Sequence, residues 1–188
     1  MVRAKVERRL AAVLAADMVG FSRLMEADEA GTLARLRAHR LELIDPAIAR
    51  QRGHIVKTTG DGMLVEFASV ADAVQSAVDI QRSIARRNAD VAPARWMQFR
   101  IGINLGDVIV EDGDIFGDGV NVAARLEALA EPGGICVSAR VQEDAAGRLD
   151  LAFEDLGDRA VKRPTACTRG RSRGWRPGMP SNGRMTSW

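Results

Sequence analysis

Apolar and polar positions recur along the chain with two different periods. An uninterrupted apolar run over residues 10–16 has the length of a buried strand and leads directly to Asp17. From residue 26 to residue 50, apolar side chains recur every three or four positions among many charges, which predicts an amphipathic helix that stops near Gly53. The same spacing over residues 69–88 predicts a second helix.

Two segments predict β-hairpins. Residues 54–67 contain two apolar alternations on either side of Gly60-Asp61-Gly62, a turn sequence typical of tight hairpins. Residues 96–112 predict another hairpin that bends at or near Gly106-Asp107. The first of these turns exposes one carboxylate at its tip.

The remaining elements complete an α+β pattern. Residues 117–131 predict a third helix that ends before a Pro-Gly-Gly sequence, and residues 135–141 and 149–157 predict two short strands with a brief helix between them. Strand–helix–hairpin units favour a ferredoxin-like split-βαβ core, with helices packed on a mixed sheet, over a doubly wound parallel sheet.

Charge divides the 188-residue chain into an acidic body and a basic tail. The net charge is +2, but seven of the 27 basic residues and none of the 25 acidic ones lie in 161–188, so the body carries about −5 and the tail +7. Periodicity disappears after Lys162, which predicts one domain over residues 1–162 and a disordered tail without a further strand over residues 163–188.

Composition also bears on whether the protein binds nucleic acid and where in the cell it is expected. An alternative interpretation, a nucleic-acid-binding protein, rests on the basic tail with Trp175 and Trp188 available for stacking. The acidic body has no nucleic-acid-reading motif, so we expect no nucleic-acid partner. No apolar run is long enough for a membrane span and no secretory signal is visible, which favours a cytoplasmic protein.

Asp17 and Asp61 are candidate metal ligands. One follows a buried strand and the other occupies a hairpin tip, so strands lying side by side would bring the two carboxylates together. Two carboxylates without a His or Cys cluster suit Mg²⁺ or Mn²⁺. The alternative is that Asp61 only forms the turn and Asp17 only caps a loop, because aspartate is common at such positions.

Three further groups of residues could bind a nucleotide. Gly20 and Ser22 follow Asp17 at the start of a helix, where backbone N–H groups can face a phosphate. Asn121 and Arg125 are four residues apart on a predicted helix and share one face, with Asp114 preceding them in a loop. Lys57 precedes Asp61 by four residues on the preceding strand. The alternative for Lys57, and for the helix face with Asn121 and Arg125, is that these side chains only face solvent.

Together these segments resemble the class III adenylate and guanylate cyclase catalytic domain over roughly residues 8–160. The resemblance rests on three motifs in the family's order, which are Asp17-Met-Val-Gly-Phe-Ser, Lys57-Thr-Thr-Gly-Asp61-Gly and Phe116-Gly-Asp-Gly-Val-Asn121-Val-Ala-Ala-Arg125. It implies the nucleotidyl cyclase fold and conversion of ATP into 3′,5′-cyclic AMP and pyrophosphate.

The resemblance also implies a role for each matching residue. Asp17, Asp61 and the Met18 carbonyl would bind two Mg²⁺ or Mn²⁺ ions. Gly20, Phe21, Ser22 and Lys162 would contact the substrate, and Lys57 and Asp114 would select adenine. Asn121 would orient the ribose, and Arg125 would stabilise charge on the α-phosphate. Since the family divides these residues between two subunits, it implies a homodimer with shared sites.

Two other functions are alternatives to an active adenylate cyclase. The altered segment after Lys162 leaves open a catalytically impaired cyclase-like domain that only binds nucleotide and dimerises. A diguanylate cyclase has a related fold, but its Gly-Gly-Asp/Glu-Glu-Phe signature is absent from the sequence.

Overall fold

The computed structural model describes residues 7–146, 148, 149, 154, 155 and 172–175. Its strands are β1 (Glu7–Met18), β2 (His54–Thr59), β3 (Gly62–Phe67), β4 (Phe99–Glu111), β5 (Asp114–Phe116), β6 (Ile135–Ser138), β7 (Glu154–Asp155) and β8 (Ser172–Trp175). Its α-helices are α1 (Phe21–Ala27), α2 (Glu29–His39), α3 (Asp45–Arg50), α4 (Val70–Asn88), α5 (Asp118–Leu129) and α6 (Ala139–Ala145).

The described strands form one sheet in the order β2-β3-β1-β4-β6-β8-β7, with β5 paired to β4. β3 lies antiparallel to β1, and β1 lies antiparallel to β4. The chain forms two strand–helix–strand units, the first from β1 to β2 through α1 to α3, and the second from β3 to β4 through α4. In the sheet β3 lies between β1 and β2, and β1 lies between β3 and β4. This is the ferredoxin-like split-βαβ arrangement, and the predicted α+β fold class is confirmed.

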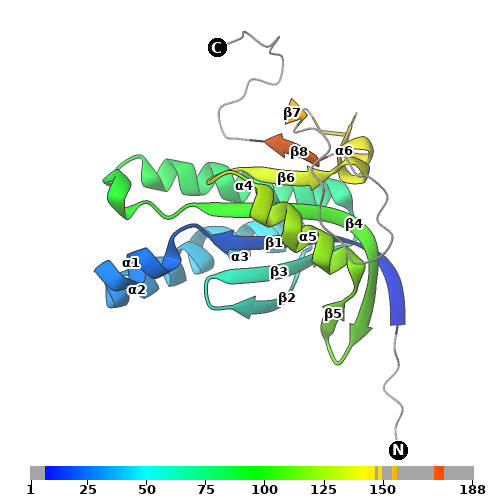
Figure 1. Ribbon diagram of the computed structural model, residues 1–188, viewed down its shortest axis with the longest axis horizontal. Helices are drawn as coiled ribbons and strands as arrows, with labels where there is room; N and C mark the ends of the chain where they lie inside the picture. Colours follow the sequence, from blue (N-terminus) through cyan, green and yellow to red (C-terminus); the bar gives the residue numbers. More distant parts are fainter. Residues whose placement is uncertain (1–6, 147, 150–153, 156–171, 176–188) are drawn as a thin grey trace, which may run out of the picture.

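Helices cover both faces of the sheet (Figure 1). Ala12, Leu14 and Ala16 of β1 face the larger core, which is shared with α1 to α4 and α6. Ala11, Val13 and Ala15 face a smaller core beneath α5. Because side chains alternate along a strand, Asp17 belongs to the second face, which we call the α5 face.

The predicted helix over residues 26–50 is wrong in its boundaries. A first helix already begins at Phe21, and α2 ends at His39, after which a π-helical segment (Arg40–Ile44) leads into α3. The N–H of Asp45 donates to the carbonyl of Arg40 instead of Leu41. Pro46 explains the change, because it has no N–H and its ring crowds the preceding turn of an α-helix.

The hairpin predicted at Gly106-Asp107 is also wrong. β4 continues through these residues, and the chain turns instead at Asp112 and Gly113, where φ is 51° and 82°. Two successive positive φ values are what a type I′ two-residue hairpin turn requires. Gly106 serves another purpose, since a Cβ on it would lie 3.0 Å from the Cα of Gly119 in α5.

The absence of a strand after Lys162 is a third expectation that the structure overturns. Ser172–Trp175 forms β8, antiparallel to both β6 and β7. Lys162 itself lies outside the described residues. The proposed domain boundary and the disorder of the rest of the tail stay predictions.

Among the described residues, no helix has both the length and the apolar character that crossing a membrane requires. The cytoplasmic location inferred from the sequence stays a prediction.

Candidate functional site

The carboxylates of Asp17 and Asp61 converge on the α5 face. Asp17 lies near the end of β1, and Asp61 lies in the turn between β2 and β3, directly before the strand that pairs with β1. Burial raises the pKa of Asp17, and the hydrogen bond with Asp61 and the charge of Asp61 raise it further. The N–H of Met18 and the charge of Arg100 act in the opposite direction.

This pair of carboxylates fits a hard divalent cation. Each supplies oxygen donors of the kind that Mg²⁺ and Mn²⁺ prefer, and a cation between them would relieve the repulsion that raises the pKa of Asp17. The described residues contain no cluster of three or more His, Cys, Asp or Glu side chains suited to a metal ion. Two carboxylates leave much of an octahedral shell to other oxygens, such as those of a bound triphosphate.

Two charged residues that the sequence analysis missed complete this part of the site. Arg100 lies opposite Asp17 in the β1–β4 ladder, and its Nε is buried without a hydrogen-bond partner among the described residues. Glu127 lies on α5, where burial and then the charge of Asp17 raise its pKa to about 7, with a smaller upward effect from Asp61 and an opposing one from Arg100. We call Asp17, Asp61, Arg100 and Glu127 the carboxylate half-site.

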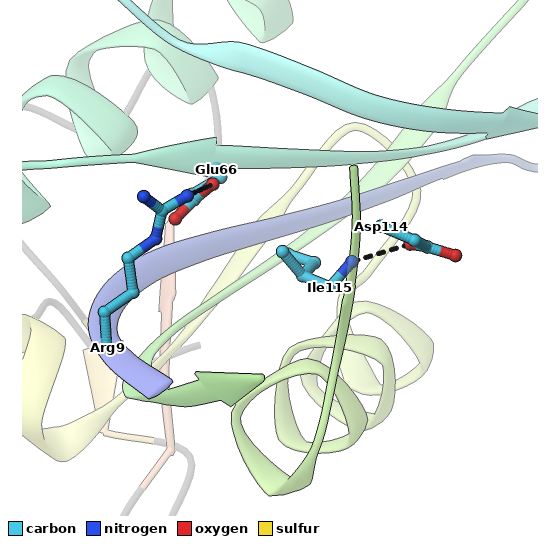
Figure 2. A network of polar contacts seen from close by, with 4 residues as sticks. All are labelled: Arg9, Glu66, Asp114 and Ile115. Carbon is cyan, nitrogen blue, oxygen red and sulfur yellow. Dashed lines mark hydrogen bonds and ion pairs between the residues drawn. The ribbon is translucent and has the colours of Figure 1, made fainter. Parts of the chain in front are cut away.

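Lys57 and Asp114 form an ion pair between β2 and β5. The Nζ of Lys57 is 2.8 Å from Oδ2 of Asp114. Oδ1 of Asp114 accepts a 2.8 Å hydrogen bond from the N–H of Ile115 (Figure 2). The hydrogen bond from Lys57 is the largest cause that lowers the pKa of Asp114; the Ile115 N–H adds to it and burial opposes it. Asp114 is therefore an ionised acceptor at neutral pH.

A second ion pair holds the sheet at the same end of the molecule. Arg9 of β1 and Glu66 of β3 lie 2.8 Å apart, and Glu66 is almost fully buried (Figure 2). Because Glu66 is enclosed, the guanidinium of Arg9 is the partner that offsets the cost of burying its side chain. The pair fixes the β1–β3 ladder beside the strands that carry Lys57 and Asp114.

Asn121 and Arg125 lie on the outer side of α5. The helix buries Gly119, Ala123 and Leu126 against the sheet. At about 100° per residue, Asn121 and Arg125 are about 150° around the helix from that buried stripe. Neither side chain has a hydrogen bond or ion pair with the described residues of its own chain. We call Lys57, Asp114, Asn121 and Arg125 the α5 half-site, since β5 leads directly into α5.

The two half-sites are therefore separate groups on one chain. α5 packs on β1 and β4, with Glu127 on the flank near Asp17 and with Asn121 and Arg125 turned away from the sheet. The family resemblance implied a division of the same kind, with the metal-binding residues on one subunit and the base-reading and Asn/Arg residues on its partner. A site shared between two subunits stays a prediction.

The other predicted substrate residues surround the start of α1. Gly20 has a left-handed backbone (φ 67°, ψ 29°) and precedes the helix. Phe21 packs against the larger core, while Ser22 is exposed and the side chain of Met18 is buried on the opposite face from Asp17. Their predicted roles toward phosphate and metal stay predictions, as does that of Lys162.

Comparison with known proteins gives one family. The family model described as the adenylate and guanylate cyclase catalytic domain matches residues 5–175. A protein of Rhizobium meliloti named putative adenylate cyclase 3 is 49% identical over 162 residues, which cover 86% of this chain and 28% of that protein. An adenylate cyclase of Streptomyces coelicolor is 34% identical over 142 residues, which cover 74% of this chain and 35% of that protein.

Solved structures agree on the fold. The adenylate/guanylate cyclase/hydrolase from Silicibacter pomeroyi superposes with a TM-score of 0.85 at 52% identity, covering 92% of this chain and 99% of that one. The adenylyl cyclase CyaB from P. aeruginosa superposes with a TM-score of 0.76 at 23% identity, covering 95% and 100%. The predicted nucleotidyl cyclase fold is confirmed. The chain spans about a third or less of the length of the two named relatives.

Proposed function

We propose a reaction from the premise that this chain belongs to the adenylate and guanylate cyclase catalytic-domain family. Its site converts ATP into 3′,5′-cyclic AMP and pyrophosphate. The observation that carries the proposal is the convergence of Asp17 and Asp61 on the α5 face, beside Arg100. In the reaction the ribose 3′-oxygen attacks the α-phosphorus while the bond to the β-phosphate oxygen breaks. The nucleophile belongs to the substrate, so no covalent enzyme intermediate is needed.

Asp17 and Asp61 would hold two divalent ions, Mg²⁺ or Mn²⁺, against the triphosphate. Such ions polarise the α-phosphate, favour ionisation of the 3′-hydroxyl and neutralise the departing pyrophosphate. Arg100 supports the same site, because its buried Nε lacks a partner among the described residues and a guanidinium suits phosphate oxygens.

Lys57 and Asp114 would select adenine through hydrogen-bond polarity. Lys57 can donate to the ring nitrogen N1, which is an acceptor in adenine and a donor in guanine. Asp114, kept ionised by Lys57 and Ile115, can accept from the 6-amino group, where guanine has a carbonyl. A mismatched buried polar pair costs about 1–3 kcal/mol, enough to set a preference for ATP over GTP.

Asn121 and Arg125 would complete the site of a second copy of the chain. Arg125 would stabilise charge on the α-phosphate and Asn121 would orient the ribose. Both point away from their own Asp17, and Leu129 at the end of α5 is an exposed apolar residue that an interface would cover. A head-to-tail homodimer brings each carboxylate half-site to the partner's α5 half-site and gives two equivalent sites.

The direct test is to incubate the purified protein with Mn²⁺ and ATP or GTP and to measure cyclic products. We expect cyclic AMP in excess of cyclic GMP. Asp17→Ala and Arg125→Ala should each reduce cyclic AMP formation at least 100-fold, about the effect of losing one transition-state contact or more. Absence of any cyclic nucleotide from the parent protein would refute the proposal for this chain.

A further inference from the structure

Lys57 joins two strands that the sheet itself does not join. β2 pairs with β3, and β5 pairs with β4, yet the Lys57 side chain of β2 reaches β5. Its Nζ lies 2.8 Å from Oδ2 of Asp114 and 5.3 Å from the centroid of the Phe116 ring. Asp114 and Phe116 are two residues apart on one strand and so project from the same face. The ammonium group of Lys57 thus contacts the Asp114 carboxylate and the neighbouring Phe116 ring at the same time.

The Lys57–Asp114 pair keeps hydrogen-bonding capacity for a purine. Oδ1 of Asp114 already accepts from Ile115, and Oδ2 accepts from Lys57. Each carboxylate oxygen has two lone pairs, so Oδ2 can accept from a purine amine beside the Lys57 ammonium, whose other N–H groups can donate to the base.

Phe116 offers the ammonium a contact that does not involve Asp114. Phe116 is 45% exposed and the side chain of its partner Lys57 is 41% exposed, so a ligand can reach both on a single chain. A cation–π contact at an exposed site changes the equilibrium constant for placing the cation over the ring by roughly two- to fivefold.

We propose that Phe116 is a positioning residue for purine selection, which together with Asp114 holds the Lys57 ammonium where it meets the base. The inference rests on the proposed function, because it assumes that Lys57 and Asp114 contact the base. It adds a specificity-determining ring that acts through Lys57.

The test compares Phe116→Leu, which removes the ring, with Phe116→Tyr, which keeps it. In Phe116→Leu we expect the ATP to GTP ratio of kcat/KM to fall about two- to fivefold, through a higher KM for ATP with kcat nearly unchanged. Phe116→Tyr should keep the parent ratio. Leu41→Ala is a matched control, because Leu41 is a 72% exposed apolar residue of the π-helical segment and should leave both values unchanged.

A double-mutant comparison separates positioning of Lys57 from a direct effect on the base. If Phe116 acts through Lys57, then Phe116→Leu should have no further effect in a Lys57→Met protein. An unchanged ATP to GTP ratio in Phe116→Leu, or an equal loss with and without Lys57, would overturn the inference.

Binding measurements test the inference apart from turnover. Calorimetric Kd values for 3′-deoxy-ATP and 3′-deoxy-GTP, which cannot cyclise, should show the same two- to fivefold fall in selectivity, roughly. Loss of binding selectivity in a protein that forms no cyclic nucleotide would refute the proposed function while supporting the role of Phe116. Unchanged binding selectivity in an active cyclase would refute the role of Phe116 alone.

Discussion

His39 is a buried histidine that makes folding sensitive to acid. It ends α2 with 6% of its surface exposed, and its Nδ1 lies 3.3 Å from the guanidinium of Arg87 on α4. Burial lowers its pKa to about 4, helped by the charges of Arg87 and Arg35 and opposed by Glu42. The folded protein therefore holds His39 neutral, whereas the unfolded chain protonates it near its ordinary value of 6.5.

Stability should fall as the pH drops below that ordinary value. Between pH 6.5 and 4 the unfolded chain binds the proton and the folded protein does not, so the contribution of His39 is constant above pH 6.5 and declines below it. From pH 7.5 to pH 5 the parent should lose about 2 kcal/mol more unfolding free energy than His39→Gln, which cannot titrate. Urea unfolding of both proteins at the two pH values measures this difference. Parallel losses in the two proteins would contradict it.

At the scale of single residues, the sequence predicted those site residues that have a local signal. Asp17 follows an apolar strand and Asp61 lies between two glycines, so each could be found from its neighbours. Arg100 and Glu127 have no such signal. Arg100 meets Asp17 only through the β1–β4 register, and Glu127 reaches the same place only because of how α5 packs on β4. Both relations are tertiary, and a single sequence does not encode them in any short motif.

Among the elements, α5 depends on one close backbone contact with β4. A Cβ on Gly102 would clash with the carbonyl oxygen of Ala123 and the N–H of Glu127, which belong to the α5 backbone and cannot rotate away. Gly102 thus allows α5 to lie close enough to the sheet for Glu127 to approach Asp17. The same contact sets the direction in which Arg125 points.

We expect Gly102→Ala to destabilise the protein by about 2–3 kcal/mol and to reduce cyclase activity beyond the loss of folded protein, because both half-sites depend on α5. Thermal unfolding and activity per folded molecule measure the two effects. Gly113→Ala is the contrasting variant, since nothing lies within 4 Å of its Cβ position and only its positive φ of 82° opposes alanine. It should cost about 1 kcal/mol and leave activity per folded molecule unchanged. Equal effects of the two variants would contradict a packing role for Gly102.

Element boundaries were harder to predict than element types. Helical periodicity located α4 closely, because its apolar stripe is long and Ser69 caps its start. It did not reveal the π-helical segment, since residues 40–44 keep a helical spacing and the change comes from Pro46. Gly106-Asp107 had the composition of a turn, but Gly106 is small there to admit Gly119 of α5. Glycine has the same appearance in a sequence whether it permits a turn or a close approach.

For the whole molecule, the family match and the sheet both extend beyond the predicted domain boundary at Lys162. The match runs to residue 175, and β8 ends at Trp175. The basic composition of the tail concealed a strand that pairs with β7 and with β6, the more distant of the two in the sequence. Long-range strand pairing of this kind depends on the assembled sheet rather than on local pattern.

The separation of the two half-sites leads to a prediction about the whole assembly. In a head-to-tail homodimer, Asp17→Ala damages the carboxylate half-site and Arg125→Ala damages the α5 half-site. A mixed dimer of the two variants then has one site with both defects and one site with neither. Random mixing makes half of the dimers mixed, and each of these keeps one of its two sites.

Mixing the two inactive variants in equal amounts should therefore restore about a quarter of the parent's cyclic AMP formation. The measurement requires refolding or co-expression so that subunits exchange, with each variant alone as its own control. A monomer whose half-sites act together within one chain would stay inactive after mixing, because no chain in the mixture has both Asp17 and Arg125. The specific activity of the parent should also decline on dilution, since a dissociated chain keeps its Arg125 turned away from its own carboxylates.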